Sequence, residues 1–159
     1  MILIAPYSKR MRNGMPSPKD YPYWDRLIKL LNKEPIVQIG IEGEVQLVPD
    51  FRKGLPIKDI EWLVTQCSYW ISVDSFLPHM ASHLGKLGVV LWGPSDPLIF
   101  GYPQNLNLLK DRRYLRKRQF EIWETDSFNP EAFLTPRQVI DAIEAWQVTI
   151  STKEVAQIG

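Results

Sequence analysis

Two short apolar runs separated by one helix-sized segment constrain the fold of this chain more than any other feature. The first run, Tyr69–Val73, is rich in aromatic and β-branched residues and ends in an Asp-Ser pair, and the second, Gly88–Trp92, ends in a Gly-Pro pair. The helical segment between them ends at Gly85. This order predicts a βαβ unit with both turns at the carboxyl ends of parallel strands. Open parallel sheets bind ligands at those ends, and a helix amino terminus there suits phosphate.

Other segments extend the same pattern over most of the chain. Apolar runs predict strands at 1–5, 36–39 and 106–109, and periodic segments predict helices at 23–32, from Pro56 to near Cys67, and from Thr135-Pro136 onwards. The stretch 45–55 has no regular pattern. We therefore expect a single Rossmann-like α/β domain over residues 1–147, with a parallel sheet of four or five strands, followed by a loosely ordered polar tail at 148–159.

Size and composition fit one globular domain. The chain has 159 residues and a net charge of +1, so the whole molecule has no strong attraction for polyanions. Cys67 is the only cysteine, which excludes an internal disulfide, and we expect it to be buried. No apolar run is long enough to span a membrane, and the apolar start of the chain is typical of a first strand rather than a signal peptide. A cytoplasmic location is the expectation.

Two motifs stand at the ends of the two central strands. They are D-S-F-L-P-H at 74–79 and G-P-S-D-P at 93–97. They resemble the D-[TS]-G-x-x-H and G-P-T-D-P motifs of the heptosyltransferase family (glycosyltransferase family 9), whose members have the two-domain GT-B architecture. The resemblance spans about residues 1–109 and corresponds to the carboxyl-terminal, nucleotide-sugar-binding half. It departs from the family at Phe76, which replaces a glycine that lets the backbone approach a phosphate closely.

The resemblance also implies individual site residues. Lys19-Asp20-Tyr21-Pro22 is similar to the family's Lys-x-Trp-Pro and lies in a loop with three other basic residues, although many such loops are simply solvated. An acidic residue after the second strand would hold the ribose; Glu42 or Glu44 could serve, and Glu42 is preferred because it is nearer the strand. The catalytic candidates are Lys19, Asp96 and His79. The candidates for donor contact are Ser8, Lys9, Lys19, Glu42, Asp74, Ser75, Phe76, His79, Gly93, Pro94 and Ser95.

The family's acidic base comes from its other half, to which this chain has no similar segment. Asp96 or Asp20 would then substitute, or a partner chain or homodimer mate would supply the base. His79 and His83 have the i, i+4 spacing of a metal site, but there is no obvious third ligand, so we expect no metal and assign His83 to ordinary helix surface. No cofactor is expected beyond the nucleotide-diphosphate sugar that acts as donor substrate.

Three functions remain open at this point. The first is metal-independent transfer of a sugar from a nucleotide-diphosphate donor to an unknown acceptor hydroxyl. The second is a non-catalytic module that binds a nucleotide or nucleotide-sugar. The third is a transferase or adaptor that acts on nucleic acid, because Lys110–Arg118 holds six basic residues in nine, with Tyr114 inside the run and Phe120 after it available for stacking.

Overall fold

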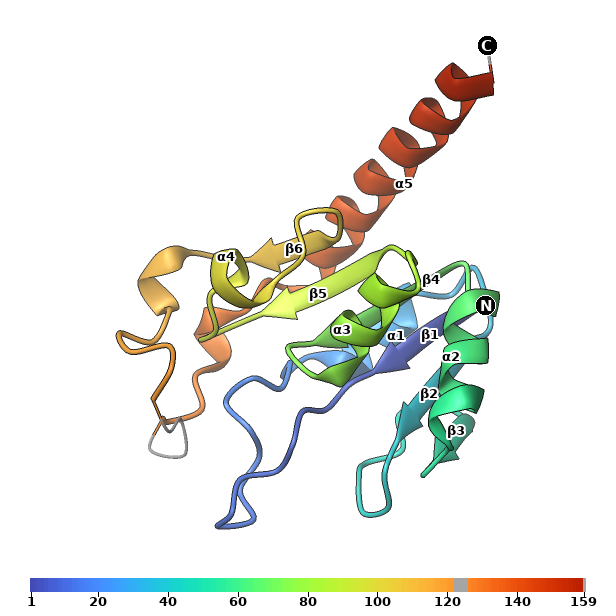
Figure 1. Ribbon diagram of the computed structural model, residues 1–159. Helices are drawn as coiled ribbons and strands as arrows, with labels where there is room; N and C mark the ends of the chain where they lie inside the picture. The colour runs from blue at the N-terminus through green and yellow to red at the C-terminus, as the bar shows by residue number, and fades with distance from the viewer. Residues whose placement is uncertain (122–125, 159) are drawn as a thin grey trace.

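The protein is built on one six-stranded, fully parallel sheet. The computed structural model describes residues 1–121 and 126–158. Figure 1 shows the strands pointing in one direction, so that their carboxyl ends form one edge of the sheet. The strands are β1 (Ile2–Ala5), β2 (Ile36–Gly40), β3 (Asp50–Lys53), β4 (Tyr69–Val73), β5 (Gly88–Trp92) and β6 (Leu106–Leu109).

The strand order is β3-β2-β1-β4-β5-β6, in which the chain runs outward from β1 in one direction and then returns to continue on its other side. This is the doubly wound Rossmann order, and its switch point lies between β1 and β4. The two central strands, β1 and β4, pair in register, from Ile2 opposite Tyr69 to Ala5 opposite Ser72. The loops that follow β1 and β4 therefore meet at the middle of the carboxyl edge.

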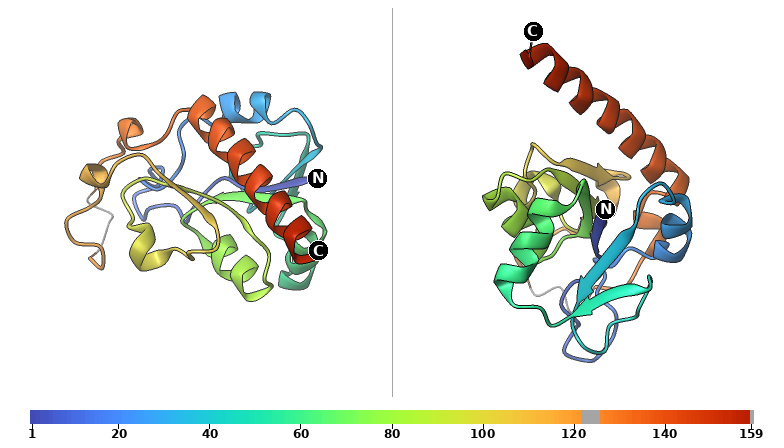
Figure 2. Two further views of the ribbon diagram at one scale, coloured as in Figure 1. Left: turned by 90° about the horizontal axis from the view of Figure 1, so that it is seen from above. Right: turned by 90° about the vertical axis from the view of Figure 1, so that its right-hand side faces the viewer.

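Helices cover both faces of the sheet. Figure 2 shows α1 (Trp24–Leu30) and α5 (Pro136–Ile158) on one face, with α2 (Ile57–Gln66) and α3 (Phe76–His83) on the other. Alternation along β1 explains the two layers, because Ile2 and Ile4 pack in the core under α1 and α5 while Leu3 and Ala5 pack under α2 and α3. Short helices α4 (Pro97–Phe100), η1 (Arg112–Tyr114) and η3 (Pro130–Ala132) lie in the connections that follow β5 and β6.

The expected fold class is confirmed, with one strand more than predicted. The additional strand, β3, lies in the stretch that showed no regular pattern. It pairs with β2 alone at the edge of the sheet, none of its residues is buried, and charged residues occupy three of its four positions. Edge strands of this kind lack the apolar signal of buried parallel strands, which is why the sequence did not reveal it.

The carboxyl-terminal segment also differs from expectation, because residues 148–158 continue helix α5 rather than forming a tail. Thr135 begins the helix with a capping box: its Oγ1 accepts from the Gln138 N–H, and its own N–H donates to Gln138 Oε1 at 2.9 Å. The hydroxyls of Thr149, Ser151 and Thr152 donate to carbonyls four residues earlier, so polar side chains that suggested a loop are accommodated within the helix. Among the residues described, no helix is both long and apolar enough to cross a bilayer.

Candidate functional site

An ion pair joins the two central loops at the carboxyl edge of the sheet. Lys19 lies in the loop between β1 and α1, Asp74 follows β4 directly, and Lys19 Nζ is 2.8 Å from Asp74 Oδ2. The two side chains are only 20% and 12% exposed, so the interaction is screened less by water than a surface pair. Two residues predicted separately as donor contacts therefore lie together.

Two cavities meet at this ion pair. Cavity A has a volume of about 580 Å³ and lies between the ends of β1 and β2 and the start of α3; its lining includes Tyr7, Ser8, Glu44, Ser75 and Phe76. Cavity B, of about 600 Å³, lies towards β5 and is lined in part by Arg12, His79, Ser95, Phe100, Gln119 and Phe120. Both are of the size that holds small ligands and cofactors. The residues common to the two linings are Lys9, Arg10, Lys19 and Asp74.

The junction of the two cavities carries a local excess of positive charge. Cavity B is lined by four cations, Lys9, Arg10, Arg12 and Lys19, against the carboxylates of Asp74 and Glu121. The predicted basic loop therefore lines a cavity and is not only a solvated surface loop. Arg10 and Arg12, which were not among the predicted contacts, lie there as well. Arg10 is held in place because its Nη2 donates to the carbonyl of Gly43.

The amino end of α3 opens at the same junction. Ser75 is the N-cap in an extended conformation, but its side chain makes no capping hydrogen bond; its Oγ lies 3.0 Å from Ser72 Oγ instead. Pro78 in the first turn has no N–H. The backbone N–H groups of Phe76 and Leu77 are therefore not capped by Ser75 and point out of the helix end, where the dipole favours an anion.

Phe76 borders cavity A without filling it. Its side chain is 48% exposed and stands at the first position of α3. A glycine at this position would leave the helix end open, whereas Phe76 adds an aromatic wall beside it. The apolar lining of cavity A is completed by Ile39, Ile41, Leu55 and Ile60. A flat aromatic ring can pack against this wall.

The structure places Glu44, and not the preferred Glu42, in cavity A. Glu42 is 84% exposed and forms an ion pair with Lys53 at 3.2 Å. The turn after β2 has Gly43 at φ +86, and it folds the chain back so that Glu44 Oε2 accepts from the Ile41 N–H at 3.1 Å. Burial raises the pKa of the Glu44 carboxyl above its ordinary value. The Gly-x-x-Gly spacing at 40–43 indicates a tight turn that reverses the chain. Glu42 was preferred only because it is nearer the strand in sequence, and that choice ignored the turn.

Ser8 and Asp20 connect the two ends of the loop between β1 and α1. Asp20 Oδ1 accepts from the Ser8 N–H at 2.8 Å and from Ser8 Oγ at 3.0 Å. Burial raises the pKa of Asp20 despite these hydrogen bonds. Tyr7 lies close by, and its own burial, together with the charges of Asp20 and Glu44, raises the pKa of its hydroxyl to about 12.

The second motif holds the loop after β5 rather than presenting a carboxylate. Asp96 Oδ1 accepts from the Leu98 N–H at 2.9 Å as N-cap of α4, and Arg112 binds both carboxylate oxygens. The Arg112 hydrogen bonds hold the pKa of Asp96 below its usual value. Gly93 is required for packing, because a Cβ there would lie 2.4 Å from the Phe133 ring. Pro94 offers its carbonyl to Gln119 Nε2, and Ser95 is buried at the wall of cavity B.

The histidines and the cysteine have separate environments. His79 Nδ1 lies 2.9 Å from the Tyr102 hydroxyl at the border of cavity B, whereas His83 lines neither cavity. Cys67 is buried as expected, and burial raises the pKa of its thiol. In the described part of the chain, no three His, Cys, Asp or Glu side chains are grouped as metal ligands would be.

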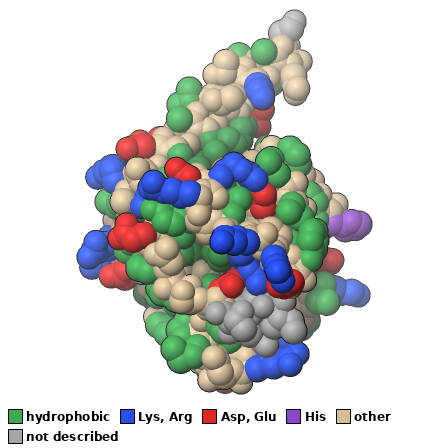
Figure 3. All heavy atoms as spheres, turned by 90° about the vertical axis from the view of Figure 1, so that its left-hand side faces the viewer, with side chains coloured by type: hydrophobic (Ala, Val, Ile, Leu, Met, Phe, Trp, Pro, Cys, Tyr) green, Lys and Arg blue, Asp and Glu red, His purple; other side chains and the backbone are tan. Residues whose placement is uncertain are grey.

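The basic run after β6 is largely paired with carboxylates. Figure 3 shows Lys and Arg side chains intermingled with Asp and Glu over this side of the molecule. Counting only pairs between residues that the structure describes, five of the six cations form ion pairs, which reduces the field that a polyanion would meet. The pairs are Lys110–Glu131, Arg112–Asp96, Arg113–Asp111, Arg116–Asp126 and Arg118–Glu121.

The strand order and the helical layers define the architecture, namely a Rossmann-like fold of the kind that forms one half of a GT-B structure. Solved structures similar to this fold include Escherichia coli heptosyltransferases. The ADP-heptose lipopolysaccharide heptosyltransferase II superposes with a TM-score of 0.64 at 18% identity over 95% of this chain and 47% of its own. The heptosyltransferase WaaC with ADP gives 0.59 at 18% identity, over 91% and 43%.

A more distant neighbour is the dodecameric iron-containing heptosyltransferase TibC in complex with ADP-D-β-D-heptose. Its TM-score is 0.53 at 14% identity, over 85% of this chain and 35% of its own. The chain thus spans about half the length of the structures it resembles, or less. No family model and no curated protein sequence matches it. The fold that the two motifs implied is confirmed, and it extends beyond residue 109 to most of the chain.

Proposed function

We propose that this chain binds a nucleotide-diphosphate sugar at the junction of cavities A and B and takes part in transferring its sugar to an acceptor hydroxyl. The observation that carries the proposal is the convergence of four cations and the uncapped amino end of α3 around the Lys19–Asp74 pair. A diphosphate needs fixed positive charge and N–H donors from two directions, and both are present here.

The two cavities suit the two ends of such a ligand. In cavity A the Glu44 carboxylate can accept from the vicinal hydroxyls of a ribose, and Phe76 with its apolar neighbours can pack against the base. The transferred sugar then lies on the side of cavity B, near His79 and Ser95. Two of the similar solved structures contain ligands of this class: WaaC is bound to ADP, and TibC is bound to ADP-D-β-D-heptose.

The chemistry of the proposed step is displacement at the anomeric carbon. An acceptor oxygen forms a new bond to that carbon as its bond to the diphosphate oxygen breaks, and the nucleoside diphosphate leaves with the electron pair. Lys19, the neighbouring cations and the α3 amino end stabilise the charge that develops on the leaving group, so the step does not depend on a metal ion.

A non-catalytic binding module is the second candidate. It is favoured by two observations: Phe76 stands where a close phosphate contact is expected, and Asp96 is engaged by Arg112 and the α4 cap rather than facing a cavity as a base. Donor turnover separates the two functions, because only an enzyme releases free sugar.

Binding is tested by calorimetric titration with ADP, UDP and GDP and with the corresponding monophosphates. We expect a diphosphate to bind at least tenfold more tightly than its monophosphate, and Lys19→Ala to reduce the affinity for the diphosphate about 10- to 100-fold. The matched control is Lys33→Ala, because Lys33 is 81% exposed and pairs with Glu144 away from the cavities. Equal binding of mono- and diphosphates, or equal losses in the two variants, would contradict the proposal.

A further inference from the structure

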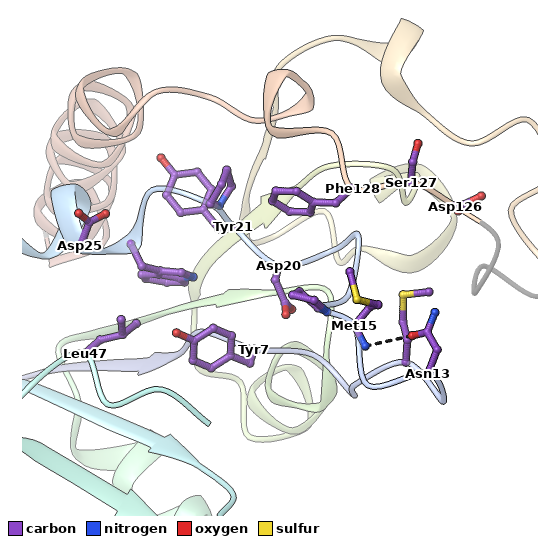
Figure 4. A pocket seen from close by; sticks show the side chains of 14 residues that line it. Tyr7, Asn13, Met15, Asp20, Tyr21, Asp25, Leu47, Asp126, Ser127 and Phe128 are labelled. Carbon is purple, nitrogen blue, oxygen red and sulfur yellow. Dashed lines mark hydrogen bonds between the residues drawn. The ribbon is translucent and has the colours of Figure 1, made fainter. Parts of the chain in front are cut away.

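A third cavity lies beside the nucleotide site and has aromatic walls. Cavity C has a volume of about 640 Å³ and is formed by the loop between β1 and α1, the start of α1 and residues 126–128. Figure 4 shows aromatic rings around one space, with the Asp20 carboxyl group among them. The aromatic walls are Tyr7, Tyr21, Trp24 and Phe128. A cavity of this size can hold a small molecule.

Every charged residue that the structure describes in the lining of cavity C is acidic. Its carboxylates are those of Asp20, Asp25 and Asp126, and no described Lys, Arg or His lines it. Cavity B, which shares the loop between β1 and α1, is instead lined by four cations. A cavity lined by one sign of charge concentrates its field and attracts ligands of the opposite sign. Cavities B and C therefore favour ligands of opposite charge.

The protein itself neutralises one of the three carboxylates. Asp126 forms an ion pair with Arg116, with 2.5 Å between Oδ2 and Nε. Asp25 is exposed in the first turn of α1, and within the described part of the chain neither Asp25 nor Asp20 forms an ion pair. Cavity C therefore keeps an excess of negative charge.

Asp20 is partly buried where it borders the cavity. The N–H and hydroxyl of Ser8 donate to its Oδ1 at 2.8 and 3.0 Å, and the backbone of Ser17 donates to the same carboxyl group. The adjacent Lys19 forms its ion pair with Asp74 instead. Burial raises the pKa of Asp20 despite these hydrogen bonds and the nearby charge of Lys19. A cation in the cavity would offset the cost of burying the ionised group.

Aromatic walls and carboxylates together favour one class of ligand. The face of a tyrosine, tryptophan or phenylalanine ring attracts a cation, and the attraction is largest where water is excluded. A neutral apolar ligand would cover Asp20 without supplying the opposite charge, which costs free energy in a partly buried site. An anionic ligand would be repelled by the same carboxylates.

We propose that cavity C binds a small organic ammonium ion, which lies against the aromatic walls and faces the carboxylates of Asp20 and Asp25. This ligand is distinct from the nucleotide-diphosphate sugar proposed for cavities A and B, and the inference does not depend on that function. No bond forms or breaks at the site. Tyr7 lines both cavity A and cavity C, and Met11 lines both B and C, so the two ligands would be neighbours of opposite charge.

The first experiment measures binding to the full chain by calorimetry. The probes are tetramethylammonium, choline and spermidine, and the neutral control is 3,3-dimethylbutan-1-ol, which has the shape of choline with carbon in place of nitrogen. We expect at least one of the cations to bind saturably and at least tenfold more tightly than the neutral alcohol. If none of the three does so, the proposal is wrong.

The second experiment locates the bound cation. Phe128→Leu keeps an apolar side chain but removes an aromatic face, and Phe128 is 44% exposed, so the fold does not depend on it. Asp20→Asn removes the charge while its amide oxygen can still accept from Ser8. We expect the affinity for the cation to fall at least threefold in Phe128→Leu and at least tenfold in Asp20→Asn.

The matched controls change residues outside the three cavities. Leu98→Ala truncates a side chain that is 81% exposed, and Asp59→Asn removes a carboxylate at an exposed position of α2. Both should bind the cation as the wild-type chain does. Unchanged affinity in Phe128→Leu and Asp20→Asn, or equal losses in the controls, would place the cation elsewhere and overturn the assignment. Thermal unfolding checks the fold of each variant, and Phe128→Leu decides the question if Asp20→Asn does not fold.

Discussion

Lys19 Nζ lies 2.8 Å from Asp74 Oδ2, and this single contact ties the loop after β1 to the end of β4 at the switch point of the sheet. Both side chains are largely buried, so the pair should contribute to stability as well as to the shape of the cavities. We expect Asp74→Ala to lower the free energy of unfolding by about 2 kcal/mol in urea titrations. Glu42→Ala removes an exposed pair with Lys53 and should cost no more than about 0.5 kcal/mol. Similar losses in the two variants would show that burial of the Lys19–Asp74 pair has no energetic weight.

Glu44 and Glu42 provide a test of ligand contact within one turn. Glu44 lines cavity A, whereas Glu42 points to solvent. We expect Glu44→Gln to weaken binding of a nucleoside diphosphate about tenfold, because an ionised carboxylate accepts more strongly from ribose hydroxyls than an amide does. Glu42→Gln should leave the affinity unchanged. Calorimetry with the ribose and 2′-deoxyribose forms adds a second readout, since Glu44→Gln should reduce the preference for ribose.

Gly40 leaves the space in which the Glu44 carboxylate lies. A Cβ at position 40 would stand 1.9 Å from Glu44 Oε2 and 3.1 Å from the Phe51 ring. The carboxylate is the far end of a flexible side chain and can move, so Gly40→Ala should change stability by less than about 1 kcal/mol. Nucleotide affinity should nevertheless fall as far as in Glu44→Gln, and the double variant should be no weaker than either single one. Additive losses would mean that Gly40 acts independently of Glu44.

We expect the contribution of Asp96 to the free energy of unfolding to decrease as pH falls. Its pKa is lowered in the folded protein, so its stabilisation is present above the unfolded pKa and is lost as pH falls through the folded one. We expect Asp96→Ala to lose about 1–2 kcal/mol at pH 7, since it removes both the α4 cap and the Arg112 pair. Asp96→Asn keeps a capping acceptor and should lose less than about 1 kcal/mol. For both variants the difference from wild type, measured by thermal unfolding across pH 2–7, should shrink towards acid pH.

The sequence predicted the buried strands well because their signal does not depend on tertiary contacts. The run Gly88–Trp92 is apolar throughout and Tyr69–Val73 is apolar except at Ser72, as is typical of strands covered on both faces, and the structure confirms both strands with the predicted bounds. Strand β3 and the last turns of α5 gave no such signal. Asp50–Lys53 is determined by pairing with β2, and residues 148–158 are determined by continuation of a helix capped at Thr135.

The positions of site residues could be predicted where a motif directly follows a strand. They could not be predicted where the conformation of a loop determines which way a side chain points. Asp74 and Ser75 lie at the expected place because β4 ends at Val73. Glu44 was not preferred because the turn at Gly43, and not distance along the chain, brings it back to β2. The partnership of Asp96 with Arg112 spans sixteen residues and could not be read from either motif.

The single direction of all six strands has a consequence for how this protein can change over time. The side chains that line these cavities come from the connections at one edge and from the strand and helix ends beside them, while the connections at the opposite edge, such as 31–35, 67–68 and 84–87, carry none of them. Selection for a different ligand can therefore rewrite one set of loops without disturbing the framework that supports them. The other set, apart from the buried Leu31 and Cys67 and the contacts of Glu34, can vary or accept a label in the laboratory without reaching the ligand.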